Sequence, residues 1–480
     1  MFLKPRSGRE PCPVLALADD LSGAAETAAA LCLPGRIVLG PATGGTAVAP
    51  PVAGEALVLD LDTRQLDARE AARIVRETVR DMARATVRAG NDTVLIKKTD
   101  SLLRGNLAAE AAAYAEGAGG LVIAPALPVA GRTVCDGVVR LHGTPLHETD
   151  AWRAETGSAP RSVAEALGDL RTEVVPLAVV RSPGRELAGR LRDLAEAGLH
   201  SVCDAETDAD LDAIAAAALQ LGPGVRLLGT GGLACALGRL LGGRSGASTP
   251  AADTPSTGVA RTADRPLLVV VGTAEPTAAA QIAQLTAAGA RHTVLPADLL
   301  ARSGAPDPAE SDAPLPLPGG HGVTVVSIDN TRGIQLGSAR RMVTGLGRAV
   351  AALPYPTDLV LTGGETARRV LDALGITRLR PVGQIHHGAV HCHTPDGRTV
   401  VTRPGSYGDT GSLLRIARAL RPDQLSVPDQ HSVPDQHSVP VEPSVPVEPS
   451  VPAESAVPGV EFDAPVPPPP VSHVPQGEVL

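Results

Sequence analysis

Two carboxylates stand side by side near the start of the chain, in the stretch Ala18-Asp-Asp-Leu-Ser-Gly-Ala24. One of Asp19 and Asp20 is suited to take a proton from a hydroxyl, and the other to bind a hydroxyl or Mg²⁺. Ser22 is suited to cap a following helix, and Gly23 lets a ligand approach the backbone. A helix cap alone would explain one acidic residue, but it explains two in succession less well.

A second dense stretch runs from residue 96 to residue 106 and reads Ile-Lys-Lys-Thr-Asp-Ser-Leu-Leu-Arg-Gly-Asn. Its lysines and arginine suit a carboxylate or a phosphate, the arginine as a bidentate fork. Its carboxylate and its amide suit the hydroxyls of a polyol. The simpler alternative is a solvated charged loop, although polar loops at strand ends often carry function. The candidate residues here are Lys97, Lys98, Asp100, Ser101, Arg104 and Asn106.

Lysine is rare in this chain, which makes the pair in the second stretch informative. Of the 43 lysines and arginines, only Lys4, Lys97 and Lys98 are lysines. An amine is a compact charge with rotatable donors, whereas a guanidinium is a planar fork, so the two are not interchangeable. The pair therefore favours a chemical role over the alternative of a chance surface pair.

Two arginines outside these stretches are further candidates. Arg64 follows a predicted strand in the segment that holds Asp60 and Asp62. Arg132 follows a loop, Ala124-Pro-Ala-Leu-Pro128, that two prolines stiffen. The sequence leaves open whether this loop borders the same pocket or is a rigid structural turn.

Glycine-containing turns recur between predicted strands and helices in the second half of the chain. In the clearest, residues 361–367, two glycines expose backbone N–H groups, and the N-terminus of the following helix favours phosphate. Its glutamate or threonine could reach Mg²⁺ or a ribose hydroxyl. One such turn is a weak signal, but three in one domain favour a nucleotide. The candidate nucleotide-binding residues are Thr273, Gly363, Gly364, Glu365, Thr366, Gly405 and Gly408.

Several familiar nucleotide sites are excluded or disfavoured. A P-loop needs Gly before Lys-Ser/Thr, but Lys98-Thr99 follows Lys97. The protein-kinase signatures His-Arg-Asp and Asp-Phe-Gly are absent from the sequence. Gly229–Ala234 fits the dinucleotide fingerprint, yet a Pro/Ser-rich segment stands where that fingerprint needs an acid. We interpret it as a structural turn, with an anion at its helix N-terminus as the alternative.

Four histidines near Cys392 raise the question of a metal site. Alternation along a strand puts two of them on one face, which a metal could use. Solvent-facing hairpin histidines are the favoured interpretation, so we expect no metal held by these side chains. The four are His386, His387, His391 and His393.

Predicted strands and helices alternate along the chain, and the strands are short apolar runs. This pattern is typical of parallel sheets covered on both faces. We expect two dissimilar three-layer α/β domains with largely parallel sheets, at residues 11–242 and 267–420, joined by a linker at 243–266. Residues 421–480 contain Pro-rich repeats that cannot form a packed core, so we predict a disordered tail. Strands are expected at 14–18, 56–61, 93–96, 121–124, 267–271, 323–328 and 359–362, helices at 24–31, 68–88, 107–115, 277–288, 338–353 and 366–374, a strand-turn-helix at 227–241, and a hairpin at 390–402.

Composition limits the partners and the compartment. A net charge of -9 argues against a nucleic-acid partner, which would call for a basic face. No signal peptide or membrane-spanning run is visible, and no membrane partner is expected. Six scattered cysteines without CxxC pairing are typical of reduced thiols in the cytoplasm. A homo-oligomer is compatible with the sequence.

These stretches, in this order, resemble the four-carbon acid sugar kinase family over about residues 11–420. The resemblance rests on 18–24, 97–106, 124–128 with Gly131-Arg132, and 362–367. It implies a sugar-acid domain followed by a nucleotide domain, with ATP and Mg²⁺ as cofactors. It also implies phosphorylation of the terminal hydroxyl of a small acid such as erythronate, threonate or 3-oxo-tetronate. The chain departs from the family pattern at Ser22, usually Thr, at Leu102, usually Thr, and at Arg403, usually Lys.

In this hypothesis Asp19 or Asp20 orients or deprotonates the acceptor hydroxyl, while basic side chains hold the carboxylate or the transferring phosphoryl group. Two alternatives stay open: a sensor that binds both ligands without transfer, and an NAD(P)-dependent oxidoreductase that rests only on Gly229–Ala234. The expected catalytic residues are Asp19, Asp20, Lys98 and Asp100. The expected substrate-binding residues are Ser22, Gly23, Arg64, Lys97, Ser101, Arg104 and Asn106.

Overall fold

The structure is a computed structural model that describes most of the first 425 residues. The described residues are 12–40, 48–90, 92–153, 155, 157–242, 265–272, 276–305, 314–317, 322–329, 339–405 and 407–425. Most of the expected linker, residues 243–264, and most of the expected disordered tail, residues 426–480, lie outside them. We call residues 12–242 the N-terminal part and residues 265–425 the C-terminal part.

The N-terminal part is built on a sheet whose neighbouring strands are all parallel in the described residues. Three of its strands, Val14–Ala18, Ala56–Asp60 and Gly120–Ala124, are wholly buried and, apart from Asp60, contain no polar side chain, as expected of a sheet covered on both faces. In spatial order the strands are β2 (Gly35–Leu39), β3 (Ala56–Asp60), β1 (Val14–Ala18), β4 (Val94–Lys98), β11 (Val225–Gly229), β5 (Gly120–Ala124), β10 (His200–Cys203) and β9 (Thr172–Val175).

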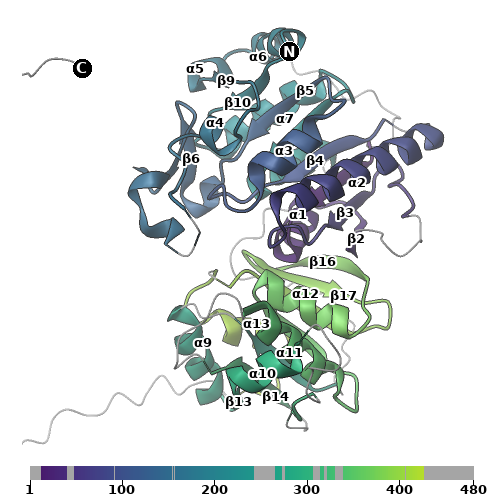
Figure 1. The fold of residues 1–480 in the computed structure, drawn as a ribbon, viewed down its shortest axis with the longest axis vertical. Helices are drawn as coiled ribbons and strands as arrows, with labels where there is room; N and C mark the ends of the chain where they lie inside the picture. Colours follow the sequence, from purple (N-terminus) through teal and green to yellow (C-terminus); the bar gives the residue numbers. More distant parts are fainter. Residues whose placement is uncertain are drawn as a thin grey trace, which may run out of the picture. The chain divides into compact units, whose positions relative to one another are not determined.

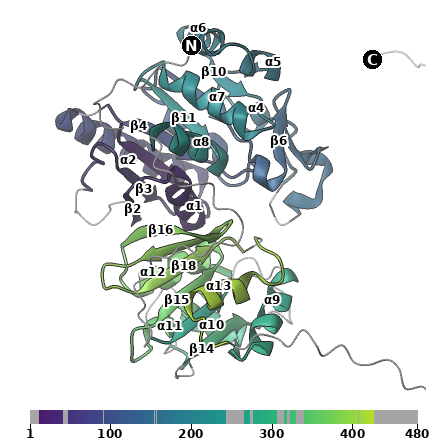
Figure 2. The ribbon, with the colours of Figure 1, turned by 180° about the vertical axis from the view of Figure 1, so that it is seen from behind.

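Helices cover both faces of this sheet. Figure 1 shows α2 and α3 in front of it, and Figure 2, seen from behind, shows α7 and α8 on the other face, where α1 and α7 also pack on α8. The helices are α1 (Leu21–Leu31), α2 (Ala68–Ala89), α3 (Leu107–Ala115), α4 (Val163–Ala166), α5 (Leu177–Val180), α6 (Gly184–Glu196), α7 (Asp208–Leu219) and α8 (Gly231–Leu241). A separate three-stranded sheet consists of β6 (Arg132–Cys135), β7 (Val138–Leu141) and β8 (Thr144–Pro145).

The C-terminal part has a mixed sheet. Five of its strands are parallel neighbours, β13 (Arg291–Leu295), β14 (Val323–Ile328), β12 (Leu267–Val271), β15 (Asp358–Thr362) and β18 (Thr399–Arg403). Two antiparallel additions follow, β17 (Ala389–His393) and β16 (Arg378–His386). The helices are α9 (Pro276–Ala287), α10 (Ala297–Ser303), α11 (Ala339–Ala351), α12 (Gly364–Ala373) and α13 (Ser412–Leu420).

Strand β16 connects the sheets of the two parts. It pairs antiparallel with β2, with Arg378 opposite Val38 and Leu379 opposite Ile37. All the described strands except β6, β7 and β8 therefore belong to one 15-stranded sheet. The sequence did not predict this connection because neither β2 nor β16 stands out as an apolar run. The α/β class with largely parallel strands is confirmed, and so is the hairpin of β17 and β18.

Candidate functional site

The two aspartates lie where β1 ends and α1 begins. Asp20 has extended backbone angles and caps α1, because its Oδ1 accepts a hydrogen bond of 2.8 Å from the Gly23 N–H. Arg64 binds both carboxylates: its Nε donates to Asp19 Oδ2 at 2.8 Å, and its Nη1 to Asp20 Oδ2 at 3.0 Å. Capping thus uses one oxygen of Asp20 and none of Asp19, and both carboxylates belong to a charged network.

The environment separates the pKa values of these two carboxyls. Burial would raise the pKa of Asp19, but the charges of Arg64 and Lys97 outweigh it and lower that pKa. Burial raises the pKa of Asp20. The charge of Arg64 lowers it, but the negative charge of Asp19 raises it further, and the net shift is upward. One carboxylate is therefore held ionised while the other is the better proton acceptor, a division found at acid–base sites.

Both lysines of the second stretch are buried, so a surface pair is ruled out. Successive side chains of β4 point to opposite faces of the sheet. The Lys97 ammonium lies 2.6 Å from Glu110 of α3, and the Lys98 ammonium lies 3.2 Å from Glu26 of α1. Burial alone would lower the pKa of Lys98, but Glu26 and then Asp100 raise it, so this amine stays charged.

Lys97 does not line the site in the way the sequence predicted. Its side chain is only 1% exposed, and its partner Glu110 is 3% exposed and also accepts a hydrogen bond from Thr63. Its charge still lowers the pKa of Asp19. We interpret Lys97 as a residue that acts on the site through its charge, from the face of the sheet that α3 covers.

The loop after β4 is fixed by an arginine fork. Arg104 donates from Nε and Nη2 to the two oxygens of Asp100, both at 2.9 Å, and the Leu102 N–H donates to Oδ1. Burial opposes ionisation, but the hydrogen bonds from Arg104 and the charge of Arg64 hold the pKa of Asp100 far below its usual range. Asp100 is thus a fixed anion, and the hydroxyl of Ser101 beside it accepts from Arg132.

Asn106 holds the loop that carries Arg64. Its Nδ2 donates to the carbonyl oxygens of Thr63 at 3.0 Å and Leu66 at 2.9 Å. The amide donors expected to bind a polyol are therefore engaged with the backbone. Gly105, with φ of +85°, is close to Asp19, since a Cβ there would lie 3.4 Å from Asp19 Oδ2.

The glycine turn before α12 meets the aspartates. A Cβ on Gly364 would lie 2.8 Å from Asp20 Oδ2 and 3.1 Å from Ser22 Oγ. Ser22 is buried, and its hydroxyl has no hydrogen-bond partner in the described part of the chain. Gly363 has φ of +96°, a conformation that favours glycine. The strand end of the N-terminal part and a helix N-terminus of the C-terminal part are therefore in direct contact.

The other residues predicted to bind the nucleotide differ in how well their surroundings suit that role. Thr366 is buried against Gly272, next to the β12 turn. Glu365 is engaged by Arg369 at 2.8 Å and by Arg340 at 3.5 Å, which leaves it poorly suited to Mg²⁺ or ribose. Thr273 lies outside the described residues.

The turn of Gly405 and Gly408 is organised by Arg403. This arginine is buried and donates to the Gly405 carbonyl at 3.4 Å and to Ser412 Oγ at 2.7 Å, while Gly408 lies against Ser412. Burial lowers the pKa of Arg403 to about 10. No carboxylate pairs with it among the described residues.

Tyr407 lies between these two glycines, and its ring packs on Gly388. Burial raises the pKa of its phenol, with further effects of Glu26, Arg132, Lys98 and Asp100. Its ring also lies 5.5 Å from that of His387. Charged groups of the N-terminal part therefore influence a phenol of the glycine turn.

Two other sequence hypotheses can be judged from the geometry. The glycines of 229–232 pack on protein atoms, since a Cβ on Gly231 would lie 2.4 Å from Glu26 and one on Gly232 2.9 Å from the Ala126 carbonyl. This supports a structural turn. The histidine prediction was wrong for His391, a residue of β17 that is only 3% exposed. The described residues contain no cluster of three or more His, Cys, Asp or Glu that could hold a metal.

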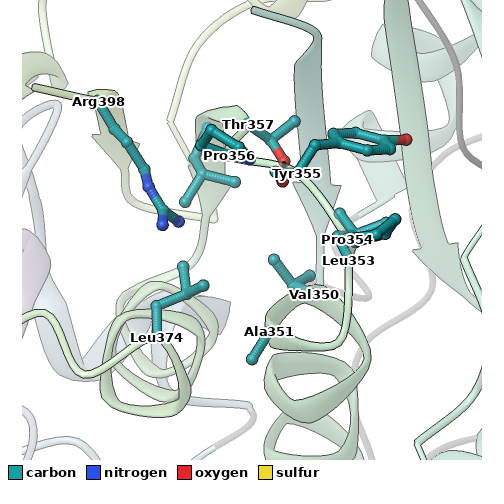
Figure 3. Close-up of a pocket in the computed structure, with 10 residues that line it drawn as sticks. Val350, Ala351, Leu353, Pro354, Tyr355, Pro356, Thr357, Leu374 and Arg398 are labelled. Atoms are coloured by element: carbon teal, nitrogen blue, oxygen red, sulfur yellow. Dashed lines mark hydrogen bonds between the residues drawn. The ribbon is translucent and has the colours of Figure 1, made fainter. Parts of the chain in front are cut away.

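A pocket of about 200 Å³ lies elsewhere in the C-terminal part (Figure 3). Its wall includes the segment 353–357 before β15, Arg398 before β18, and Leu374 after α12. It therefore lies at the amino ends of these strands, whereas open α/β sheets bind ligands at the carboxyl ends. The pocket is not part of the site described above.

The sequence reasoning missed the acidic partners of the lysines. Glu26 and Glu110 each stand alone among alanines, in Ala24-Ala-Glu-Thr-Ala28 and Leu107-Ala-Ala-Glu-Ala-Ala-Ala113. A helix made mostly of small apolar residues is expected to be buried, so a single glutamate within it is expected to be buried as well. A buried carboxylate needs a cation beside it. With only two lysines available at the neighbouring strand, that signal could have predicted both pairs.

Comparisons with known proteins agree with this arrangement. Residues 14–237 match the sugar-binding N-terminal domain, and residues 268–413 match the nucleotide-binding C-terminal domain. A D-threonate kinase of Cupriavidus necator is 33% identical over 420 residues, which cover 85% of this chain and 97% of that protein. A D-threonate kinase of Bordetella bronchiseptica is 32% identical, covering 84% and 96%.

A solved structure supports the fold. A Salmonella typhimurium LT2 protein superimposes with a TM-score of 0.64 at 22% identity, covering 85% of this chain and 99% of that one. Every helix in the residues described is too short or too polar to cross a membrane.

Proposed function

This chain belongs to the four-carbon acid sugar kinase family and is an enzyme that phosphorylates a sugar acid; we propose that its donor is ATP and its acceptor is D-threonate or a close four-carbon relative. The γ-phosphoryl group would pass to the terminal hydroxyl of the acid. This reaction would take place in the cytoplasm, where ATP is available and the free cysteines would stay reduced.

The contact between Gly364 and Asp20 is the observation that carries this proposal. The N-terminus of a helix favours a phosphate, although the N–H of Gly363 here donates to the Arg403 carbonyl at 2.9 Å and only later N–H groups of the turn would serve. A carboxylate with a raised pKa favours proton transfer. Because these two groups touch, a nucleotide phosphate bound at α12 would be next to the group that accepts the proton. Catalysis would then consist mostly of positioning and charge stabilisation.

Each residue of the network has a proposed role. Asp20 takes the proton of the acceptor hydroxyl, and Asp19 keeps Arg64 in place. Lys98 stabilises negative charge that develops on the transferring group, since it is buried, charged and close to Gly23. Gly363, Gly364, Thr366, Gly405 and Gly408 form the proposed nucleotide-binding turns.

Mg²⁺ fits this donor set. It usually takes one or two protein oxygens and completes its shell with phosphates and water, so a dedicated cluster is not required. The unpartnered hydroxyl of Ser22, close to Asp20 and Gly364, is a suitable oxygen donor. When bound, the ion would neutralise charge on the nucleotide phosphates.

The test is ATP consumption by the purified full chain with a panel of four-carbon sugar acids. We expect turnover with D-threonate or one of its stereoisomers and a product phosphorylated at the terminal hydroxyl, identified by ³¹P NMR. Binding of an acid and ATP without turnover would favour the sensor instead. If Asp20→Asn and Lys98→Ala both left turnover of every accepted acid unchanged, the site assignment would be wrong.

A further inference from the structure

The basic side chains near Asp19, Asp20 and Asp100 differ in whether they have an acidic partner. Lys97 pairs with Glu110 and Lys98 with Glu26. Arg64 binds the two aspartates that precede α1, and both oxygens of Asp100 accept hydrogen bonds from Arg104. Arg132 is the exception: in the residues that the structure describes, no carboxylate lies within ion-pair distance of its guanidinium.

Arg132 is held in place although its charge is not paired. It begins β6, and its backbone exchanges hydrogen bonds of 2.8 and 3.1 Å with Leu127 in the loop after β5. Its strand pairs with β7, with Arg132 opposite Leu141. The position of the side chain therefore comes from a rigid backbone, and a preorganised arginine loses little freedom when it binds.

The guanidinium points to the loop after β4. Its Nη1 donates to the Ser101 hydroxyl, while its Nε is buried without a hydrogen-bond partner in the described residues. A buried unsatisfied donor costs free energy, and this cost disappears when an acceptor arrives. Ser101 follows Asp100, which lies 3.7 Å from Arg64, and Arg64 binds Asp19 and Asp20, so a chain of contacts runs from Arg132 to the aspartates.

We infer that Arg132, assisted by Ser101, recognises the carboxylate of the sugar acid. This inference rests on the proposed function, since it assigns one end of its substrate. An arginine fork matches a carboxylate with two parallel hydrogen bonds, and the other cations nearby are already neutralised by protein carboxylates. Asp20 would then meet the terminal hydroxyl, and Arg132 the opposite end of the molecule.

This assignment differs from the sequence-based expectation that Lys97, Lys98 and Arg104 hold the substrate carboxylate. A substrate carboxylate at any of those three would compete with Glu110, Glu26 or Asp100 for the same cation. At Arg132 it would supply a missing counter-charge instead. The competing explanation is that Arg132 merely fixes the Ser101 loop.

The experiment compares an acid with its uncharged analogue. Two quantities are measured in the wild type and in Arg132→Met. They are kcat/KM for the preferred acid of the panel and the inhibition constant of its primary amide. We expect kcat/KM for the acid to fall about 10- to 100-fold, the range for loss of a charge-assisted hydrogen bond. The inhibition constant of the amide and the KM for ATP should change less than about twofold.

Two further variants complete the test. Arg140→Met removes the same charge from the same small sheet, where the one hydrogen bond of the Arg140 side chain within the described residues goes to the Gly143 carbonyl, and should leave binding of both ligands unaffected. Arg132→Lys should recover part of the lost kcat/KM for the acid. If kcat/KM for the acid fell and the inhibition constant of the amide rose by the same factor in Arg132→Met, Arg132 would have a structural role, and the inference would be overturned. If the wild type phosphorylated no acid, the proposed function itself would fail.

Discussion

Arg368 of α12 and Asp60 at the end of β3 form a buried ion pair, with Nη1 of the arginine 2.9 Å from Oδ2 of the carboxylate. The next residue of the helix, Arg369, pairs with Asp62 in the same way. The helix whose first residues contact Asp20 is thus also tied to the neighbouring strand. These two ion pairs fix the position of the glycine turn relative to the proposed base.

Asp60 should make the stability of the protein depend on pH. Burial, opposed by Arg368, raises its pKa from 3.8 to about 7 in the folded protein. The folded state therefore binds more protons than the unfolded state between these values, so stability should fall as pH rises from about 4 to about 7 and level off above 7. The loss is about 1.4 kcal/mol per pH unit for one group. Thermal unfolding of the wild type and Asp60→Asn from pH 4.5 to 8.5 measures it, and parallel curves would contradict the assignment.

The order of elements could be predicted because burial on both faces makes strands continuous apolar runs. Val14–Ala18 and Leu267–Val271 are such runs, and both appear as strands with these bounds. The sequence predicts no elements between Arg132 and Val225, because the strands there are short and half polar, as in His200–Cys203. The β2–β16 pairing could not be foreseen, since pairing of edge strands leaves no periodic signal in either sequence.

The glycine at position 364 should be essential for activity but not for folding. A Cβ there would lie 2.8 Å from Asp20 Oδ2, so in Gly364→Ala either the Asp20 carboxylate or the start of α12 must shift. Displacement of about 1 Å can cost roughly 100-fold in rate, and we expect kcat to fall by about that factor. Alanine favours helix, so the melting temperature should hardly change.

A matched control exists on another helix. Gly189 in α6 has no atom within 4 Å of its Cβ position, so Gly189→Ala should leave both kcat and folding intact. Steady-state kinetics and circular dichroism of the two variants make the comparison. Normal kcat in Gly364→Ala would mean that the close approach is not used in catalysis.

The two aspartates should respond differently to neutralisation. Asp20→Asn removes the proposed base, and kcat should fall about 100- to 10,000-fold. Asp19→Asn removes the charge that helps to raise the pKa of Asp20. Because a base works only when deprotonated, the acid limb of the kcat/KM profile should move to lower pH in Asp19→Asn. An unmoved limb, measured from pH 5 to 9, would show that Asp20 does not control it.

The site was predictable as a list of side chains but not as a set of pairs. Asp19, Asp20 and Lys98 stand out in sequence because polar residues at the ends of buried strands need a reason. Their partners Glu26 and Arg64 lie on other elements, and only the fold brings them within 3.2 Å. Lys97 shows most directly what the sequence does not reveal. It is adjacent to Lys98 in the chain, yet the two side chains point to opposite faces of the sheet and pair with different helices.

The two lysines give the sharpest separation of stability from catalysis. Lys97→Met and Lys98→Met each leave a buried glutamate without its cation, which should destabilise the protein by about 3–5 kcal/mol. Neutralising the partner as well, in Lys97→Met/Glu110→Gln and Lys98→Met/Glu26→Gln, should restore much of the stability in both cases. Activity should return only in the first double variant, because Lys98 is the proposed charge-stabilising residue. Urea unfolding and kcat of the four variants decide this, and recovery of kcat in Lys98→Met/Glu26→Gln would remove Lys98 from the mechanism.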